Sequence, residues 1–563
     1  MRTAEPSNTD RLIASIREAV IGRSEMVEGP FGPRPVVYAD YTASGRALSF
    51  IEDYVLGHVL PLYANTHTES SGTGLQTTRF REDARAIIAE CVGATDEHAV
   101  VFCGTGTTGA IAKLIGVLGI RIPSALDDRY RLTDHIPADE RPVVFIGPFE
   151  HHSNELPWRE SIADVVTIGA DHDGHVDLDH LEQELQRHAD RPRLIGSFSA
   201  ASNVTGITTD TAAVSTLLHR YGAIALWDYA AAGPYVAIDM GSPTTGPGYL
   251  DAVFLSPHKF IGGPGTPGLL IARRELFANR VPDVPGGGTV AYVNPTEHVY
   301  LDAIEHREEG GTPDIVGAIR AGLVFQLKAA VGAEEIQRRE ERFVRDAVTE
   351  WSQHPNIDIL GNLDAERLSI VSFTIRDGDL RLHHNFVVAV LNDLFGIQSR
   401  GGCSCAGPYG HRLLGIDLDR SHAFEREIQR GCEGIKPGWV RVNFNYFIDD
   451  ETFRYIVDAV SIIADRGRSL LALYRFEPDS GLWRHRDGLT TPPLSLHDVR
   501  YVDGTMQASR RPTMLPEGGL PAYLERAQAL LDELERSMPD PLPHPPTSDD
   551  FEHLRWFHYA DER

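Results

Sequence analysis

The sequence predicts an α/β protein whose larger part is a mostly parallel β-sheet with helices on both faces. Between about residues 36 and 275, short apolar runs of strand length alternate with helical stretches, and each run ends in small, polar or glycine-containing residues. Most of these runs are apolar throughout, as in strands covered on both faces. The clearest six are Ala99–Cys103, Val143–Ile146, Val165–Ile168, Leu194–Ser199, Ala223–Trp227 and Ala252–Leu255. After about residue 310 the pattern changes to that of a smaller α+β domain.

Elements outside this sheet follow from apolar periodicity. An N-terminal helix is expected over Ser7–Ile21, because Leu12, Ile13, Ile16 and Val20 fall on one face. In the smaller domain we expect helices at Ile315–Val331 and Phe386–Phe395, and strands at Leu368–Phe373 and Trp439–Phe444. Near the C-terminus, Pro521–Met538 reads as an amphipathic helix and 539–546 as an extended proline-rich segment.

These patterns divide the chain into four expected parts. Residues 1–35 form an N-terminal helical segment that packs with the small domain, and residues 36–310 form the large, cofactor-binding domain. Residues 311–470 form the small α+β domain, and residues 471–563 form a C-terminal extension.

Composition excludes several classes of function. The chain has 563 residues and a net charge of −27, which leaves no basic excess to bind nucleic-acid phosphates. Its five cysteines are too few for a disulfide framework and favour a reducing compartment. No signal-peptide core and no membrane-spanning apolar run is present in the sequence. We therefore expect a cytoplasmic protein without nucleic-acid or membrane partners.

Lys259 is the candidate for covalent attachment of a cofactor. It follows the strand Ala252–Leu255 in the segment Ser256-Pro257-His258-Lys259, and a Gly-Gly-Pro-Gly turn begins at Gly262. An amine just past a strand end can form a Schiff base with a ligand in the crevice there, and small residues let that ligand approach the backbone. A lone lysine is otherwise an ordinary surface residue, so the interpretation depends on partners.

Asp228 is such a partner. It follows the apolar run Ala223–Trp227, and its spacing of 31 positions from Lys259 leaves room for a crossover helix and a strand. Both side chains can then meet at one edge of the sheet. A buried carboxylate keeps the pyridine nitrogen of pyridoxal 5′-phosphate (PLP) protonated, as this cofactor requires to act as an electron sink. Taken alone, an aspartate here is equally a turn or helix-capping residue.

Three further turns after strands supply candidate cofactor contacts. The segment Cys103–Gly109 (CGTGTTG) leads into the expected helix Ala110–Leu118, and helix N-termini bind phosphate; it is not a P-loop, because no Gly-Lys-Ser/Thr ends it. His151, in Glu-His-His-Ser-Asn, could stack on a flat ring, and Asn203 could hydrogen-bond a ring hydroxyl. A solvated loop, a histidine metal pair and a plain turn asparagine are the alternatives. Adjacent histidines are poor metal ligands on a strand, so no metal site is expected.

Together these segments resemble the class V aminotransferase superfamily and, within it, the cysteine desulfurases. The order is Gly-Thr-Thr, Glu-His-His-x-Asn, Ser-Asn-x-x-Gly, Trp-Asp-x-Ala, Ser-x-His-Lys and Gly-Gly-Thr-Pro, over about residues 36–465. The resemblance implies a fold-type I PLP-dependent transferase with a seven-stranded sheet. It also implies a homodimer with active sites at the subunit interface.

The resemblance implies a role for each matching residue. Lys259 would carry the cofactor, Asp228 would pair with the pyridinium, His151 would stack on the ring and Asn203 would contact the ring oxygen. The implied phosphate ligands are Thr107, Thr108, Ser256 and His258, and Gly106 is a further cofactor-binding residue; Thr312 would reach the phosphate of the other subunit's cofactor. One departure is that desulfurases usually have glutamine three residues after the aspartate, where this chain has Ala231.

The segment Ser399–Pro408 (SRGGCSCAGP) bears on the reaction. A desulfurase needs a cysteine that attacks the substrate sulfur and an arginine for the substrate carboxylate. In the family the arginine precedes the nucleophile by five residues, as Arg400 precedes Cys405. Arg441 resembles the second carboxylate-binding arginine. Cys403 adds a Cys-x-Cys pair like that of molybdenum-cofactor sulfurases, in which the second thiol could resolve or relay a persulfide; the alternative is two ordinary loop thiols.

We therefore expect a PLP-dependent cysteine desulfurase that converts L-cysteine to alanine and leaves a persulfide on Cys405, with a sulfur-acceptor protein as possible partner. Lys259 would remove the Cα proton. A PLP-dependent C–S lyase, a selenocysteine lyase or another enzyme of the superfamily is the first alternative, and a non-catalytic binding or scaffold member is the second. The presence of both Lys259 and Asp228 argues against the last.

Overall fold

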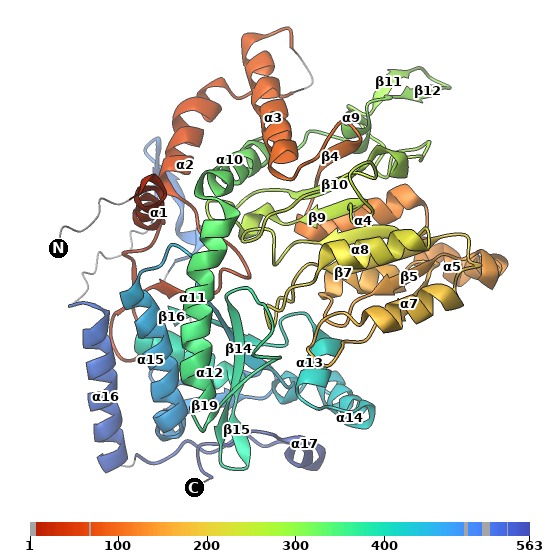
Figure 1. Ribbon diagram of the computed structural model, residues 1–563. Coiled ribbons are helices and arrows are strands. Elements are labelled where there is room, and N and C mark those ends of the chain that lie inside the picture. Colours follow the sequence, from red (N-terminus) through yellow and green to blue (C-terminus); the bar gives the residue numbers. More distant parts are fainter. Residues whose placement is uncertain (1–6, 67–68, 489–493, 509–517, 538, 563) are drawn as a thin grey trace.

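A seven-stranded sheet forms the centre of the larger domain in the computed structural model, which describes residues 7–66, 69–488, 494–508, 518–537 and 539–562 (Figure 1). The strand order is β4-β10-β9-β8-β7-β5-β6, and only β10 runs antiparallel to its neighbours. The strands are β4 (His98–Cys103), β5 (Val143–Ile146), β6 (Asp164–Thr167), β7 (Leu194–Ser199), β8 (Ile224–Asp228), β9 (Ala252–Leu255) and β10 (Gly268–Arg273). The predicted α/β class is confirmed, and the six predicted strands lie within one residue of their expected bounds.

Helices cover both faces of this sheet because its strands are apolar on both faces. Alternate strand residues such as Phe145 and Trp227 pack with α3 (Gly72–Cys91), α7 (Leu178–Arg187), α8 (Thr211–Arg220) and α10 (Ile315–Val331). The intervening residues, such as Val144 and Leu226, pack with α4 (Gly106–Leu118) and α6 (Leu156–Arg159). This two-sided burial explains why most of the strands are apolar runs without polar alternation.

The smaller domain is an antiparallel sheet with its own core. Its strand order is β13-β14-β18-β17, and β15 also pairs with β14. The strands are β13 (Ile357–Ile359), β14 (Ile370–Asp377), β15 (Leu380–Leu382), β17 (Arg400–Gly402) and β18 (Trp439–Asn443). The packed helices are α11 (Ala333–Ser352), α12 (His384–Phe395), α14 (Leu418–Gln429) and α15 (Asp450–Arg466). The strand expected at Leu368–Phe373 begins two residues later and continues to Asp377.

The C-terminal extension is built into the second core. It contains the hairpin β19 (Tyr474–Glu477) and β20 (Leu482–His485), the hairpin β21 (Arg500–Val502) and β22 (Thr505–Gln507), α16 (Leu520–Ser537) and α17 (Asp549–Leu554). Tyr523, Leu531 and Phe557 are buried with side chains of α12 and α15. The amphipathic helix predicted at Pro521–Met538 is α16; Met538 lies outside the described residues. The expected extended segment 539–546 contains neither helix nor strand.

The N-terminal helix α1 (Asn8–Ala19) contacts both domains. A capping box between Ser7 and Asp10 starts it. Ile13 and Ile16 are buried in the core of the large domain, whereas Arg17 Nε donates to the carbonyl of Phe447, just after β18 (2.5 Å). Among the described residues, no single helix is long and apolar enough to cross a membrane. Helices α10 and α11 meet that test only as a pair, and the pair is bent by 74°.

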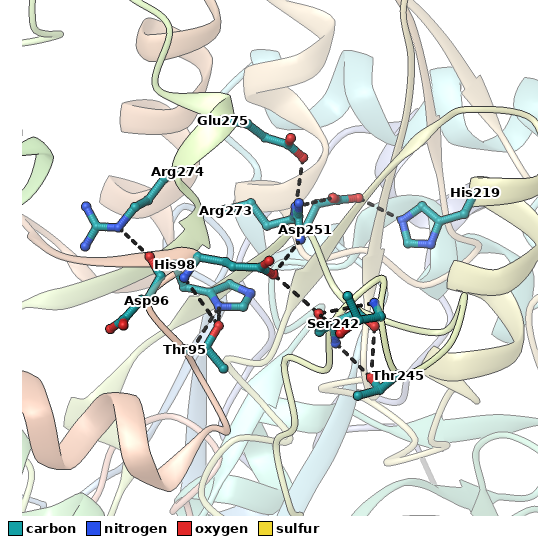
Figure 2. Close-up of polar contacts among 12 residues, drawn as sticks. Thr95, Asp96, His98, His219, Ser242, Thr245, Asp251, Arg273, Arg274 and Glu275 are labelled. Carbon is teal, nitrogen blue, oxygen red and sulfur yellow. Dashed lines mark hydrogen bonds and ion pairs between the residues drawn. The ribbon is translucent and has the colours of Figure 1, made fainter.

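A polar network joins the strand ends at the edge of the sheet opposite Asp228 and Lys259 (Figure 2). Asp251, which precedes β9, accepts a hydrogen bond from the backbone N–H of Ala225 (2.7 Å) and pairs with His219 (2.9 Å) and, more loosely, with Arg273 (3.7 Å). The ring of His219 also stacks on Tyr249 at 3.8 Å. Burial alone would lower the pKa of His219, but its hydrogen bonds to Asp251 and to the Pro247 carbonyl raise that pKa above its ordinary value.

The raised pKa of His219 predicts a pH-dependent contribution to stability. The contribution is fully present below the unfolded-state pKa of about 6.5 and is lost as the pH rises through the folded-state pKa. His219→Gln should therefore lower the free energy of unfolding by about 1 kcal/mol more at pH 6 than at pH 9. Urea titrations at the two pH values measure this difference. His172→Gln, at an exposed histidine, is the control; an equal loss at both pH values in H219Q would contradict the prediction.

Candidate active site

A cavity of about 190 Å³ lies at the carboxyl ends of the parallel strands, where α/β sheets bind ligands. Turns after β4, β5, β7, β8 and β9 supply its walls. The lining residues are Thr105, Gly106, Thr107, Thr108, His151, Ser153, Ser199, Ala201, Asn203, Asp228, Ala230, Ala231, Ser256, His258 and Lys259. Nine of the cofactor-binding candidates named from the sequence thus line one cavity; Thr312 is the exception.

Lys259 and Asp228 share this cavity. Asp228 is the last residue of β8 and is 4% exposed; its Oδ1 accepts a hydrogen bond from the Ala230 N–H (2.7 Å). Burial raises the pKa of Asp228, against the opposing effects of that N–H and of Lys259. Burial also lowers the pKa of Lys259 to about 8, although Asp228 acts to raise it. The cavity therefore holds an amine that loses its proton near neutral pH and a carboxylate with no ion pair among the described residues.

The turn before α4 and the turn after β9 are bonded to each other. Ser256 Oγ accepts a hydrogen bond from the Thr107 backbone N–H (2.9 Å) and lies 3.0 Å from Thr107 Oγ1. Gly106 has φ +54°, and a Cβ there would lie 2.7 Å from Ser256 Oγ, so the close approach requires glycine. Thr108 Oγ1 lies 2.6 Å from Ser153 Oγ. Hydroxyls and a helix N-terminus thus converge at one end of the cavity, as an anion requires.

His151 and Asn203 line the cavity, where the imidazole ring of His151 and the amide of Asn203 could contact a ligand. Burial, together with the charge of Lys259, lowers the pKa of His151 to about 3, so its imidazole is neutral. Nδ1 of His151 accepts a hydrogen bond from the Ser153 N–H (3.1 Å). Asn203 Nδ2 donates to the carbonyl of Ser404 (2.7 Å), whereas its buried Oδ1 has no partner among the described residues.

The two candidate carboxylate-binding arginines are brought side by side. Arg400 in β17 is the direct cross-strand partner of Arg441 in β18, and directly opposed residues project from the same face of a sheet. Both lie close enough to Lys259 and His151 to lower the pKa of each. Arg441 is 3% exposed; it donates to the carbonyl of Asn203 (3.0 Å) and forms an ion pair with Asp40 (2.8 Å).

The Cys-x-Cys loop is held against the large domain by its backbone. The His152 N–H donates to the carbonyl of Cys405 (2.9 Å), and the Gly407 N–H donates to Nε2 of His152 (3.1 Å). Ser404 and Cys405 both have positive φ, at 51° and 57°, a conformation that costs about 1–2 kcal/mol per non-glycine residue. Cys403 is exposed and Cys405 is half-buried, and neither lines the cavity that contains Lys259.

Thr312 lies outside the cavity of its own chain. It is exposed, and its Oγ1 accepts a hydrogen bond from Asn65 Nδ2 (3.4 Å). Its expected contact with the cofactor of a second subunit stays a prediction.

Several supporting residues were not assigned from the sequence. Asp40 and Arg441 are 401 positions apart, so no local pattern joins them. Glu150 is buried between the ends of β5 and β7, where it accepts hydrogen bonds from both the N–H and the hydroxyl of Ser199 (2.9 and 2.6 Å). Its signal in the sequence was its place in the Glu-His-His-x-Asn motif, beside the predicted His151.

A family model for class-V aminotransferases matches residues 37–419. The chain therefore belongs to the class-V aminotransferase family, an enzyme family, as its motifs indicated. Among curated relatives, a probable cysteine desulfurase of Streptomyces coelicolor is 26% identical over 380 residues, or 66% of this chain and 84% of that protein. A cysteine desulfurase of Dickeya dadantii is 28% identical over 412 residues, or 71% of this chain and 92% of that protein.

Solved structures agree on the fold. A cysteine desulfurase from Thermococcus onnurineus superposes with a TM-score of 0.61 at 23% identity, covering 76% of this chain and 95% of that one. The cysteine desulfurase CsdA from Escherichia coli gives a TM-score of 0.61 at 21% identity, covering 81% and 98%. In each pair the superposition covers a smaller share of this chain than of the other, as expected if this chain carries an additional C-terminal extension.

Proposed function

We propose that the protein is a PLP-dependent cysteine desulfurase. The observation that carries the proposal is the placement of Lys259 and Asp228 in one cavity, beside the arginine pair Arg400 and Arg441. The curated relatives named cysteine desulfurase support the same reaction.

The residues of the cavity fit PLP. Lys259 would hold the cofactor covalently, Asp228 would keep the pyridine nitrogen protonated, and the neutral ring of His151 would stack on it. Thr107, Thr108, Ser256 and His258 would bind the phosphate. The raised pKa of buried Asp228, and Asn203 Oδ1, which has no hydrogen-bond partner among the described residues, support a bound ligand here. When bound, PLP supplies an electron sink for the electrons released at the substrate Cα.

The chain's own groups would then bind the substrate and move its proton and its sulfur. Arg400 and Arg441 would orient the carboxylate of L-cysteine as a fork. Lys259 would take the Cα proton, which its pKa of about 8 allows near neutral pH. The Cys405 thiolate would attack the substrate sulfur, so that an S–S bond forms as the substrate C–S bond breaks. Alanine leaves, and the persulfide stays on Cys405.

Assembly and location extend the proposal. We infer a cytoplasmic homodimer in which Thr312 completes the partner's phosphate site, and a division into the four segments expected from the sequence. Apolar side chains exposed around α2 (Ser49–Tyr54) and on the hairpin of β11 (Val290–Val293) and β12 (His298–Tyr300) support a dimer. They include Leu56, Leu60, Tyr292 and Val299. The molecular mass of the purified protein, measured by analytical ultracentrifugation, tests whether it is a dimer.

One assay separates the reactions open to this site. The purified protein, loaded with PLP, is incubated with L-cysteine. We expect alanine, and a Cys405-containing peptide heavier by one sulfur atom. Pyruvate and ammonia in place of alanine would identify a C–S lyase. Turnover of L-selenocysteine without turnover of L-cysteine would identify a selenocysteine lyase. Bound PLP without any product would indicate a non-catalytic member.

Asp228→Asn should lower kcat for alanine formation by about 10²–10³-fold, because the amide cannot stabilise a positive charge on the ring nitrogen. The absorption band of bound PLP should shift at the same time, which loss of folding would not produce. Asp239→Asn, at an exposed aspartate on the same connection, is the matched control. An unchanged kcat and an unchanged spectrum in D228N would contradict the proposed contact between Asp228 and the pyridine nitrogen.

A further inference from the structure

A second cavity, of about 510 Å³, lies beside the Cys-x-Cys loop. It shares no lining residue with the cofactor cavity. Its walls come from the end of β17, the start of α12, α13 (Gly407–Leu413), α14 and the turn at Gly481 of the C-terminal extension. Cys403 lines this cavity. We call it the Cys403 cavity.

Two buried polar side chains of the Cys403 cavity lack partners. His384 is 5% exposed and Trp439 is 1% exposed, yet His384 Nδ1 and Trp439 Nε1 have no hydrogen-bond partner among the described residues. Two other polar side chains of the walls have partners: Asn385 Nδ2 donates to the Gly481 carbonyl (2.8 Å), and Lys436 pairs with Glu433. Buried polar groups are nearly always bonded, so it is unusual that two polar rings of this cavity wall have a buried nitrogen without a partner among the described residues.

The C-terminal extension fixes this wall. The ring of His384 stacks on that of His383 at 4.3 Å and lies 5.6 Å from Trp556, nearly parallel to it (9°). Trp556 is itself held by a hydrogen bond from its Nε1 to the Ile435 carbonyl (3.0 Å). Glycine at 438 lets the turn before β18 approach, because a Cβ there would lie 2.8 Å from Gly402 and 2.9 Å from His384. The wall is thus preformed.

We propose that the Cys403 cavity binds a low-molecular-weight thiol, which takes up the sulfur from Cys403. This inference deepens, and rests on, the proposed desulfurase function. A volume of about 510 Å³ is in the range of small-molecule sites. Cys403 is exposed, whereas Cys405 is half-buried and absent from this cavity. Burial lowers the pKa of His384 to about 3, so its neutral ring can accept a hydrogen bond from a thiol.

The proposed transfers balance without an added oxidant or reductant. The Cys403 thiolate attacks the outer sulfur of the Cys405 persulfide, which forms a persulfide on Cys403 and releases the Cys405 thiolate. The thiolate of the bound acceptor then attacks the outer sulfur on Cys403, which gives the acceptor persulfide and frees the Cys403 thiolate. Each step is an exchange at sulfur. Cys405 would thus accept sulfur from the substrate, and Cys403 would deliver it to the acceptor.

A labelling experiment tests the cavity without catalysis. The PLP-loaded full-length protein is treated with 2-hydroxyethyl disulfide, and mass spectrometry follows mixed-disulfide formation at each cysteine. Labelling of Cys403 should saturate with probe concentration. Ser421→Trp, which fills the cavity from α14, should slow it at least about tenfold. His422→Trp, at the adjacent exposed position, should leave it within about twofold. Labelling that never saturates, or that is equal in S421W and wild type, would overturn the proposal.

A second measurement uses L-cysteine with β-mercaptoethanol as the acceptor. Cys403→Ser should keep the first-turnover burst of alanine, but should slow formation of the mercaptoethanol persulfide at least about tenfold and leave sulfur on Cys405. Wild-type transfer by C403S would overturn the relay. A protein without any alanine burst, but with saturable labelling of Cys403, would instead reject the desulfurase function and keep the thiol site.

Discussion

Lys259→Ala should reduce alanine formation from L-cysteine by about 10⁴-fold or more, one of the two largest effects expected of a single substitution. The variant loses the amine that would hold PLP and the base that would take the Cα proton. Both losses act at the same atom, Nζ, which lies in the cavity with Asp228. Steady-state alanine release with excess PLP measures the loss of activity.

The attachment has its own readout. Borohydride reduction of the wild-type protein with PLP should leave a phosphopyridoxyl group on the peptide that contains Lys259, and K259A should carry none. Lys259→Arg is the matched variant, because it keeps a positive charge opposite Asp228 but cannot form the covalent link. K259R should be as inactive as K259A, with a melting temperature near that of wild type. Substantial activity in either variant would contradict the assignment.

Cys405→Ser should abolish both the alanine burst and the persulfide, with a loss of about 10⁴-fold or more, because a serine hydroxyl cannot accept sulfur from the substrate. Cys403→Ser, two residues away on the same loop, is the matched control and should keep the burst. A rapid-quench assay of alanine, with the peptide masses of the loop, checks both variants. A burst that survives in C405S and disappears in C403S would assign the nucleophile to Cys403.

Most of the large domain could be predicted from the sequence, since most of its strands are buried on both faces and are mainly apolar. β10 was not among the named strands. Its residues Gly268–Arg273 follow a glycine-rich turn, and an antiparallel return between β4 and β9 has no local signature. The integration of the extension was also not predictable, because the contact of Trp556 with His384 joins positions far apart in the chain.

In the site, too, residues that follow strands could be predicted from the sequence, whereas contacts between the two domains could not. Lys259, Asp228, His151 and Asn203 each follow a strand, so topology alone brings them to one edge of the sheet. The anchoring of the Cys-x-Cys loop by His152 depends instead on how the small domain docks on the large one.

The ion pair between Asp40 and Arg441 has a consequence for substrate choice. An incoming carboxylate meets a guanidinium that already holds an anion, and that anion is tethered and so present at high effective concentration. We expect a ligand that contacts Arg441 alone to compete poorly with Asp40, and a ligand that also contacts Arg400 to bind more tightly. We therefore expect this internal ion pair to favour ligands whose carboxylate engages both arginines.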